Sequence, residues 1–248
     1  MFNIKTDLNL NKSTYLTLIL ESKEHFVEFR DRLLQLFVIS TITFLLVLCS
    51  INVGAEIILR LIPEIQFFQL SPQEFLITSL VSLLNLSIIL LYPYIIRNLI
   101  FFFGPSLLLT EKKLLFPLIT ISILFSVLAI SFSFSVLAPT TFEFFLNYNS
   151  NNIEPFWSFK DFSSFLIGLI YIDLILFQLP LLQITLTVIN LITVETMIQN
   201  WKNVLLFAFL LSGIVTPSTD PFTQILLALT ICLLYGSGIF FSKLLYSK

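Results

Sequence analysis

One stretch of the sequence decides the fold class: residues 114–142 read LLFPLITISILFSVLAISFSFSVLAPTTF and lie between Lys113 and Glu143 without a charged side chain. An α-helix rises about 1.5 Å per residue, so about 20 predominantly apolar residues are enough to cross a bilayer. The stretch is continuously apolar and lacks the alternation that a membrane β-strand would need. It therefore predicts a membrane-spanning α-helix.

Five further apolar runs between charged residues follow the same pattern. We therefore predict an all-α membrane protein with six transmembrane helices, the last two of them short, at about residues 33–52, 75–98, 114–137, 163–188, 203–217 and 222–241. We expect residues 1–20 to form an N-terminal tail and residues 21–248 to form a single membrane domain.

The composition excludes several other classes of protein. The chain has 248 residues, of which 57% are hydrophobic and 11% are charged, and its mean hydropathy is +0.97. Soluble domains carry charge on roughly a quarter of their residues, so an ordinary soluble enzyme and a basic nucleic-acid binder are excluded. Cys49, Cys232 and the single histidine, His25, form no disulfide framework or metal-binding pattern. We find no catalytic constellation and no cofactor signature, and we expect a protein that is not an enzyme.

The basic residues predict the orientation of the chain in the membrane. All but two of the 13 Lys and Arg residues fall on one side of the six predicted helices, in the N-terminal segment, in alternate loops and in the C-terminal tail. The other side carries Arg60 and Lys160. Because short basic loops stay on the cytoplasmic face, we expect both termini on the cytoplasmic or stromal side.

Two acids stand at the predicted membrane interface on that side. Glu28 shares one helical face with Arg32 in an amphipathic segment that leads into the first span. On these residues alone, the simplest interpretation is a weak surface pair. Glu111 follows Gly104-Pro105 in the loop between the second and third spans, where it suits the first turn of a helix.

Two polar residues interrupt the fourth predicted span. Asp173 has to be neutral, hydrated or paired at that depth, and Gln178 suits a hydrogen bond between helices. These two residues are five apart, so they point in different directions around a helix. Pro180 in this span and Pro93 in the second span should kink their helices.

Four segments in order along residues 24–245 resemble the TatC family, the multi-spanning subunit of the twin-arginine (Sec-independent) protein translocase, in its cyanobacterial and plastid branch. Each segment corresponds to a family motif: the entry into the first helix, the lead into the second, the first cytoplasmic loop and the turn between the last two helices. They are His25-Phe26-Val27-Glu28-Phe29-Arg30-Asp31-Arg32-Leu33, Ser71-Pro72-Gln73-Glu74-Phe75, Tyr92-Pro93-Tyr94 with Phe102-Phe103-Gly104-Pro105 and Thr110-Glu111-Lys112-Lys113, and Thr216-Pro217-Ser218-Thr219-Asp220-Pro221.

The resemblance implies a receptor for twin-arginine signal peptides of folded precursor proteins. Family members use the glutamates of the entry motif and of the first loop, here Glu28 and Glu111, for the paired arginines. The expected signal-peptide site comprises Glu28, Glu111, Arg30, Phe102 and Pro105. The resemblance also implies that Gln178 docks small single-span TatA/TatB-type partners, that other copies of the chain and the lipid bilayer are partners, and that Pro217 and Asp220 form a structural turn.

Some positions depart from the bacterial pattern and indicate where the chain resides. Gln178 stands where many bacterial members carry Glu, and Phe26 and Phe29 replace leucines. The 28 Phe residues suggest an AT-rich genome, and residues 1–20 do not read as a transit peptide. We therefore expect a plastid-encoded protein of the thylakoid membrane, the alternatives being a bacterial or a mitochondrial inner membrane.

Two other functions are left open by the residues. A secondary transporter or channel subunit would use Asp173 as its ion site and should show inverted repeats, which are not evident here. A passive assembly scaffold would not bind precursor peptides.

Overall fold

The computed structural model describes residues 4–49, 67–69, 71–103, 115–147, 157–215 and 221–246. Within them the chain is almost entirely helical, and the short strands β1 and β2 form one two-stranded sheet. The elements are α1 (Ile4–Cys49), β1 (Phe67–Phe68), α3 (Glu74–Phe103), α4 (Leu115–Phe132), the π-helix η3 (Ser133–Leu137), α5 (Ala138–Asn147), β2 (Trp157–Ser158), α6 (Phe159–Leu176), α7 (Leu179–Val188), α8 (Val194–Gln199), α9 (Trp201–Val215) and α10 (Pro221–Tyr246).

The described helices confirm the predicted all-α membrane class. Five of them are long and apolar enough to cross a bilayer: Phe26–Cys49, Glu74–Phe102, Leu115–Asn147, Phe159–Val188 and Pro221–Leu244. The shorter apolar helix Trp201–Ile214 corresponds to the sixth predicted span.

The lengths of the first and last helices differ from what the apolar runs suggested. α9 is short, with 15 residues, but α10 has 26, so the prediction that both C-terminal helices are short is wrong for α10. The helix continues past the last apolar run because Lys243 and Tyr246 are compatible with helix at a membrane interface. At the other terminus, α1 begins at Ile4, so residues 4–20 of the expected tail continue the first span as helix.

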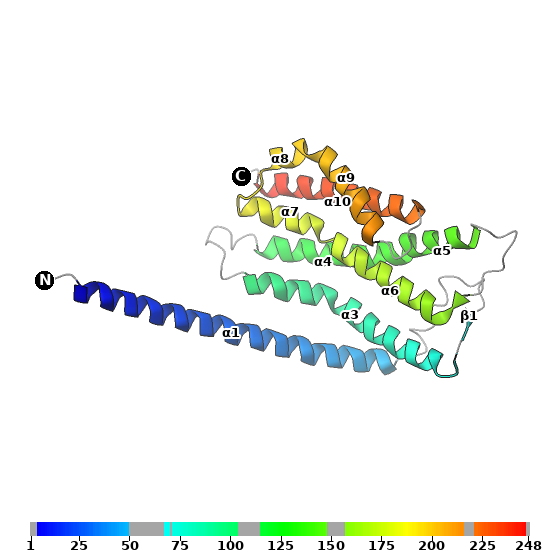
Figure 1. Ribbon diagram of the computed structural model, residues 1–248, viewed down its shortest axis with the longest axis horizontal. Coiled ribbons are helices and arrows are strands. Elements are labelled where there is room, and N and C mark those ends of the chain that lie inside the picture. The colour runs from blue at the N-terminus through cyan, green and yellow to red at the C-terminus, as the bar shows by residue number, and fades with distance from the viewer. Residues whose placement is uncertain are drawn as a thin grey trace.

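The helices run back and forth along one direction, so that the start of α1 and the end of α10 lie at the same end of the molecule (Figure 1). We call this the terminal end; it also carries the end of α3, the start of α4 and the connection between α7 and α8. α3 packs against α1, α4 and α6, while α10 packs against α7 and α9. This arrangement agrees with both termini on one side of a membrane, and the cytoplasmic or stromal identity of that side stays a prediction.

Breaks in the helices occur beside prolines. α6 ends at Leu176, Phe177 and Gln178 form a turn, and Pro180 lies in the first turn of α7, where its missing N–H costs no hydrogen bond. The π-helix is followed directly by Ala138 and Pro139; because Pro139 cannot donate to the turn before it, the wider π-turn separates α4 from α5 there. Pro93 lies inside α3, which is continuous from Glu74 to Phe103. Pro217 and Asp220 lie outside the described residues.

At the end opposite to the termini, a small polar and aromatic assembly joins the second and fourth spans. β1 and β2 pair in parallel, with Phe67 opposite Trp157. The buried Glu74 carboxylate accepts hydrogen bonds from the Ser158 hydroxyl at 3.0 Å and from the Ser71 backbone N–H at 3.3 Å. The hydrogen bond from Ser71 therefore stabilises the start of α3, and the hydrogen bond from Ser158 attaches α3 to the segment before α6.

Candidate functional site

The predicted recognition acid Glu28 lies on α1 near the terminal end and is already paired. Arg32, one helical turn later, donates from Nε at 3.1 Å and from Nη2 at 2.5 Å, both to Oε1 of Glu28. The side chains are 34% exposed for Glu28 and 25% exposed for Arg32. At this intermediate exposure, water reduces the cost of burying the charges without fully screening their attraction.

Aromatic side chains of α3 complete the surroundings of this pair. The rings of Phe29 on α1 and Phe102 on α3 lie 5.4 Å apart. The guanidinium carbon of Arg32 lies 5.9 Å from the centre of the Phe101 ring, and that of Arg97 lies 5.5 Å from the same ring. The Glu28 carboxylate on α1 is thus bordered by aromatic rings of α1 and α3. These surroundings suit a planar guanidinium.

The other predicted signal-peptide residues are only partly brought together. Arg30 forms an exposed ion pair with its neighbour Asp31 at 2.8 Å, on the same helix as Glu28. Phe102 reaches the site through its contact with Phe29. Glu111 and Pro105 lie outside the described residues, so their positions relative to Glu28 stay a prediction.

Gln178 lies in the turn between α6 and α7, beside a groove of about 550 Å³. Its Nε2 donates to the Ser126 hydroxyl at 3.0 Å, whereas its buried Oε1 has no hydrogen-bond partner among the described residues. The groove is otherwise mostly apolar and is lined by Tyr92, Ile96, Leu99 and Ile100 of α3, Leu115 and Leu118 of α4, and Ile175, Leu179, Leu181, Leu182, Thr185, Val188 and Ile189 from α6 to the end of α7. An amide in such surroundings gains from a polar partner.

Asp173 is completely buried within α6. Its Oδ2 accepts a hydrogen bond from the hydroxyl of Ser133, the first residue of the π-helix, at 2.5 Å. Its Oδ1 has no partner among the described residues. Of the three states considered from the sequence, the structure therefore shows a hydrogen-bonded carboxyl that joins α6 to the third span.

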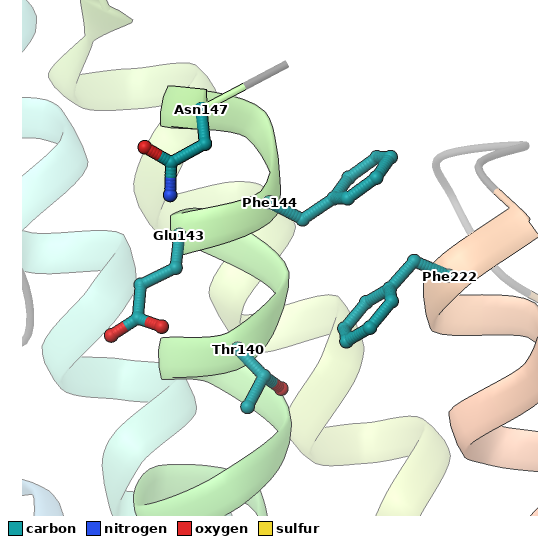
Figure 2. Close-up of a pocket in the computed structure, with 5 residues that line it drawn as sticks. All are labelled: Thr140, Glu143, Phe144, Asn147 and Phe222. Carbon is teal, nitrogen blue, oxygen red and sulfur yellow. The ribbon is translucent and has the colours of Figure 1, made fainter.

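A second hollow, of about 390 Å³, lies at the opposite end of the molecule between α5 and α10 (Figure 2). The rings of Phe144 and Phe222 both line it, and their centres lie 5.4 Å apart with the ring planes nearly parallel. Glu143 and Asn147 point away from this ring pair. The rings join the third and sixth spans, and the exposed Glu143 belongs to α5, which lies at the end of the molecule opposite to the terminal end.

Sequence reasoning missed the partners of these polar residues. Ser126 and Ser133 were not singled out, although they are seven residues apart and so share one face of a helix. Such a polar face in an apolar span was the available signal that another polar residue packs against it. Phe101 and Arg97 were likewise missed, because their shared ring contact depends on how α3 folds back beside α1.

No metal-binding cluster of three or more His, Cys, Asp or Glu side chains occurs among the residues that the structure describes. Both cysteines, Cys49 and Cys232, are free thiols in separate helices.

Comparison with known proteins identifies the family. The family described as "Sec-independent protein translocase protein (TatC)" matches residues 24–229. The chain belongs to the TatC family. It is thus a subunit of a Sec-independent protein translocase and a multi-pass membrane protein, which confirms the resemblance read from the four motifs.

Individual TatC relatives cover most of the chain. It is 34% identical over 234 residues, or 94% of its length, to an uncharacterized tatC-like protein ycf43 of Trieres chinensis, of which it covers 89%. It is 33% identical over 175 residues to the Sec-independent protein translocase protein TatC of Synechocystis, covering 71% of this chain and 69% of that one. The chloroplastic TATC protein of Pisum sativum is 34% identical over 73% of this chain, which spans about half of the pea protein.

A solved TatC structure shares the fold. The crystal structure described as "Twin Arginine Translocase Receptor- TatC in DDM" superposes with a TM-score of 0.70 at 29% identity, covering 88% of this chain and 99% of that one. The order and packing of the described helices are therefore those of a TatC protein.

Proposed function

We propose that this TatC-family protein is the receptor that binds twin-arginine signal peptides of folded precursor proteins, with Glu28 and Glu111 as the recognition acids. The observation that carries the proposal is the Glu28 carboxylate, which holds a guanidinium group beside an aromatic ring at a partly exposed helix surface. A surface that accepts one arginine in this way has the chemistry to accept an arginine of a peptide.

The physical chemistry favours arginine over lysine at this position. A guanidinium is planar and donates two parallel hydrogen bonds to a carboxylate, whereas an ammonium acts as a point charge. The same planar group stacks on aromatic rings, as Arg32 and Arg97 do on Phe101. The pair of consecutive arginines would require a second carboxylate, and we assign that role to Glu111.

Three further residues belong to the proposed signal-peptide site. Phe102 borders Glu28 through Phe29 and would contact the apolar part of a peptide. Pro105 would shape the loop that carries Glu111. Arg30 would fix the direction of the entry segment through its neighbour Asp31. The name of the similar solved structure, a twin-arginine translocase receptor, supports the same assignment.

Recruitment of small single-span TatA/TatB-type partners forms the second part of the proposal. Gln178 presents a buried amide oxygen without a partner among the described residues, beside a mostly apolar groove. A partner helix with one polar residue in an apolar surface would satisfy both features. Other copies of the chain would join the same assembly in a bilayer, which we place in the plastid thylakoid on the strength of the chloroplastic and cyanobacterial relatives.

The recognition acids are tested by crosslinking a twin-arginine precursor to the membrane-inserted protein. Glu28→Ala and Glu111→Ala should each abolish the crosslink while insertion into the membrane continues, because each removes one carboxylate from the site. Glu143→Ala removes an exposed carboxylate at the opposite end of the molecule and should leave the crosslink unchanged. Normal precursor binding by both Glu28 and Glu111 variants would refute the assignment.

A matched pair of signal peptides tests the chemistry of recognition directly. The wild-type protein should retain a peptide carrying Arg-Arg in a pull-down and release one carrying Lys-Lys, because the ammonium groups cannot form the paired hydrogen bonds. Retention of neither peptide would favour the assembly scaffold over the receptor, and equal retention of the two would refute recognition of arginine by its paired hydrogen bonds.

The partner-docking proposal is tested by copurification of the small single-span protein. Gln178→Leu should weaken copurification and leave signal-peptide binding intact, because it removes the amide but keeps the groove apolar. Ser126→Ala removes only the internal partner of Gln178 and should retain the small protein. Unchanged copurification with Gln178→Leu would contradict this role.

A further inference from the structure

We propose that Arg32 is an internal placeholder for a signal-peptide arginine: it occupies the Glu28 carboxylate in the free receptor and has to leave before a peptide guanidinium can bind there fully. This inference rests on the proposed function, because it concerns the competition for Glu28. Removal of Arg32 should therefore raise the affinity for the signal peptide, whereas removal of a residue that binds the peptide would lower it.

The geometry of the pair supports displacement. Both Arg32 donors, Nε and Nη2, bind the same oxygen of Glu28, Oε1. A peptide arginine that donates two parallel hydrogen bonds to a carboxylate needs both of its oxygens. While Arg32 holds Oε1, an incoming guanidinium can use at most the other oxygen, so complete recognition requires that Arg32 withdraws.

The surroundings make that withdrawal inexpensive. Arg32 is 25% exposed, and ion pairs one helical turn apart at such a surface are weak. Its guanidinium shares the Phe101 ring with that of Arg97, and two like charges beside one ring oppose each other. An arginine that leaves Glu28 exchanges this contact for water, whereas the peptide arginine takes over both the carboxylate and the ring.

The consequence for binding is a uniform reduction in affinity. If Glu28 is available only in the fraction of molecules in which Arg32 has moved away, the apparent affinity of every peptide that needs Glu28 is the intrinsic affinity multiplied by that fraction. An ammonium is affected as well, because Arg32 neutralises the charge of the carboxylate that either group would bind, so the preference for arginine over lysine should change little. Arg32 would therefore limit how tightly the receptor retains its cargo, which favours release of the precursor after docking.

The experiment measures the affinity of twin-arginine and Lys-Lys signal peptides for the full-length protein in detergent. Arg32→Gln should raise the affinity for the twin-arginine peptide by up to about fivefold, the range of a weak ion pair, and should leave the ratio between the two peptides unchanged. Arg32→Lys keeps the positive charge but loses the planar guanidinium and its paired donors, so it should raise the affinity less than Arg32→Gln does. It serves as the second variant if Arg32→Gln does not fold.

A double variant and a matched control decide the interpretation. In a Glu28→Gln background the gain from Arg32→Gln should disappear, because there is no longer a carboxylate to compete for. Arg97→Gln removes the other guanidinium from Phe101 and should leave the affinity unchanged or lower it, because the charge that opposes Arg32 beside that ring is lost. An equal gain from Arg97→Gln would reduce the effect to a general loss of positive charge and overturn the proposal.

The placeholder role of Arg32 and the recognition role of Glu28 can be refuted independently of each other. Unchanged or reduced affinity in both Arg32 variants, together with reduced affinity in Glu28→Gln, would overturn the placeholder and leave the receptor function standing. Normal binding in Glu28→Gln would instead contradict the recognition role of Glu28 itself.

Discussion

Glu28 and Asp173 are two carboxyl groups in the same bundle with opposite surroundings. Glu28 is about one third exposed and pairs with an arginine one turn away on its own helix. Asp173 is completely buried, and its partner, Ser133, comes from a different helix 40 residues earlier in the chain. The interfacial acid can exchange partners because water lowers the cost of the exchange, whereas the buried acid has no such alternative.

This difference separates recognition from stability. Changes at Glu28 should alter binding and leave the folded state nearly as stable, since the pair with Arg32 contributes little to it. Changes at Asp173 should alter the free energy of unfolding and affect binding only through the fold, because the Asp173–Ser133 hydrogen bond joins α6 to the start of the π-helix.

The largest effect is expected from Asp173→Lys. Asp173 is fully buried, and a lysine there would put a charged side chain inside the membrane, so the variant should lose about 3 kcal/mol or more of stability. Unfolding of the purified protein in mixed micelles would measure this loss. Wild-type stability would indicate that the side chain reaches water, and the contrast with Glu28 would break down.

Glu28→Gln should give the next largest effect, on binding alone. Loss of a hydrogen bond to a charged group costs about 1.5–3 kcal/mol, so the affinity for a twin-arginine peptide should fall by about tenfold or more. The free energy of unfolding should change by less than about 0.5 kcal/mol, as for other exposed pairs one turn apart. A variant that loses stability and binding in proportion would show that Glu28 is structural.

A smaller effect should distinguish the two partners of the buried hydrogen bond. Ser133→Ala leaves the Asp173 carboxyl without its donor and should cost about 1–2 kcal/mol. Asp173→Asn keeps an acceptor oxygen for the Ser133 hydroxyl and should stay within about 0.5 kcal/mol of wild type. An Asn variant that is stable but inactive in precursor transport would assign the buried carboxyl a function of its own and would favour the transporter-like alternative.

The smallest effect is expected at Glu143, the exposed acid of the opposite end. Glu143→Gln should change neither peptide affinity nor stability by more than about 0.5 kcal/mol, because the side chain is exposed and points away from the Phe144–Phe222 pair. The same binding and unfolding assays would reveal any departure. Loss of peptide binding in Glu143→Gln would contradict recognition at the terminal end of the bundle.

Local apolar runs were sufficient to predict most of the helices. Residues 114–142 predict a span because every backbone polar group must be satisfied within a helix in lipid, whatever its neighbours are. The same reasoning did not anticipate the π-helix at Ser133–Leu137, because the register of one turn depends on how Pro139 and the packing around it are accommodated. It also underestimated the length of α10, where polar residues after the apolar run remain helical.

The sequence by itself therefore determined the membrane class, the family and the nomination of Glu28, Asp173 and Gln178. Each of these depends on residue types at fixed spacing along one segment. Only the tertiary structure decided the partners: Ser133 for Asp173, Ser126 for Gln178, and the Phe101 ring beside the Glu28–Arg32 pair. These contacts join helices that are far apart in sequence, and they form because a polar group excluded from water must find its partner on whichever helix packs against it.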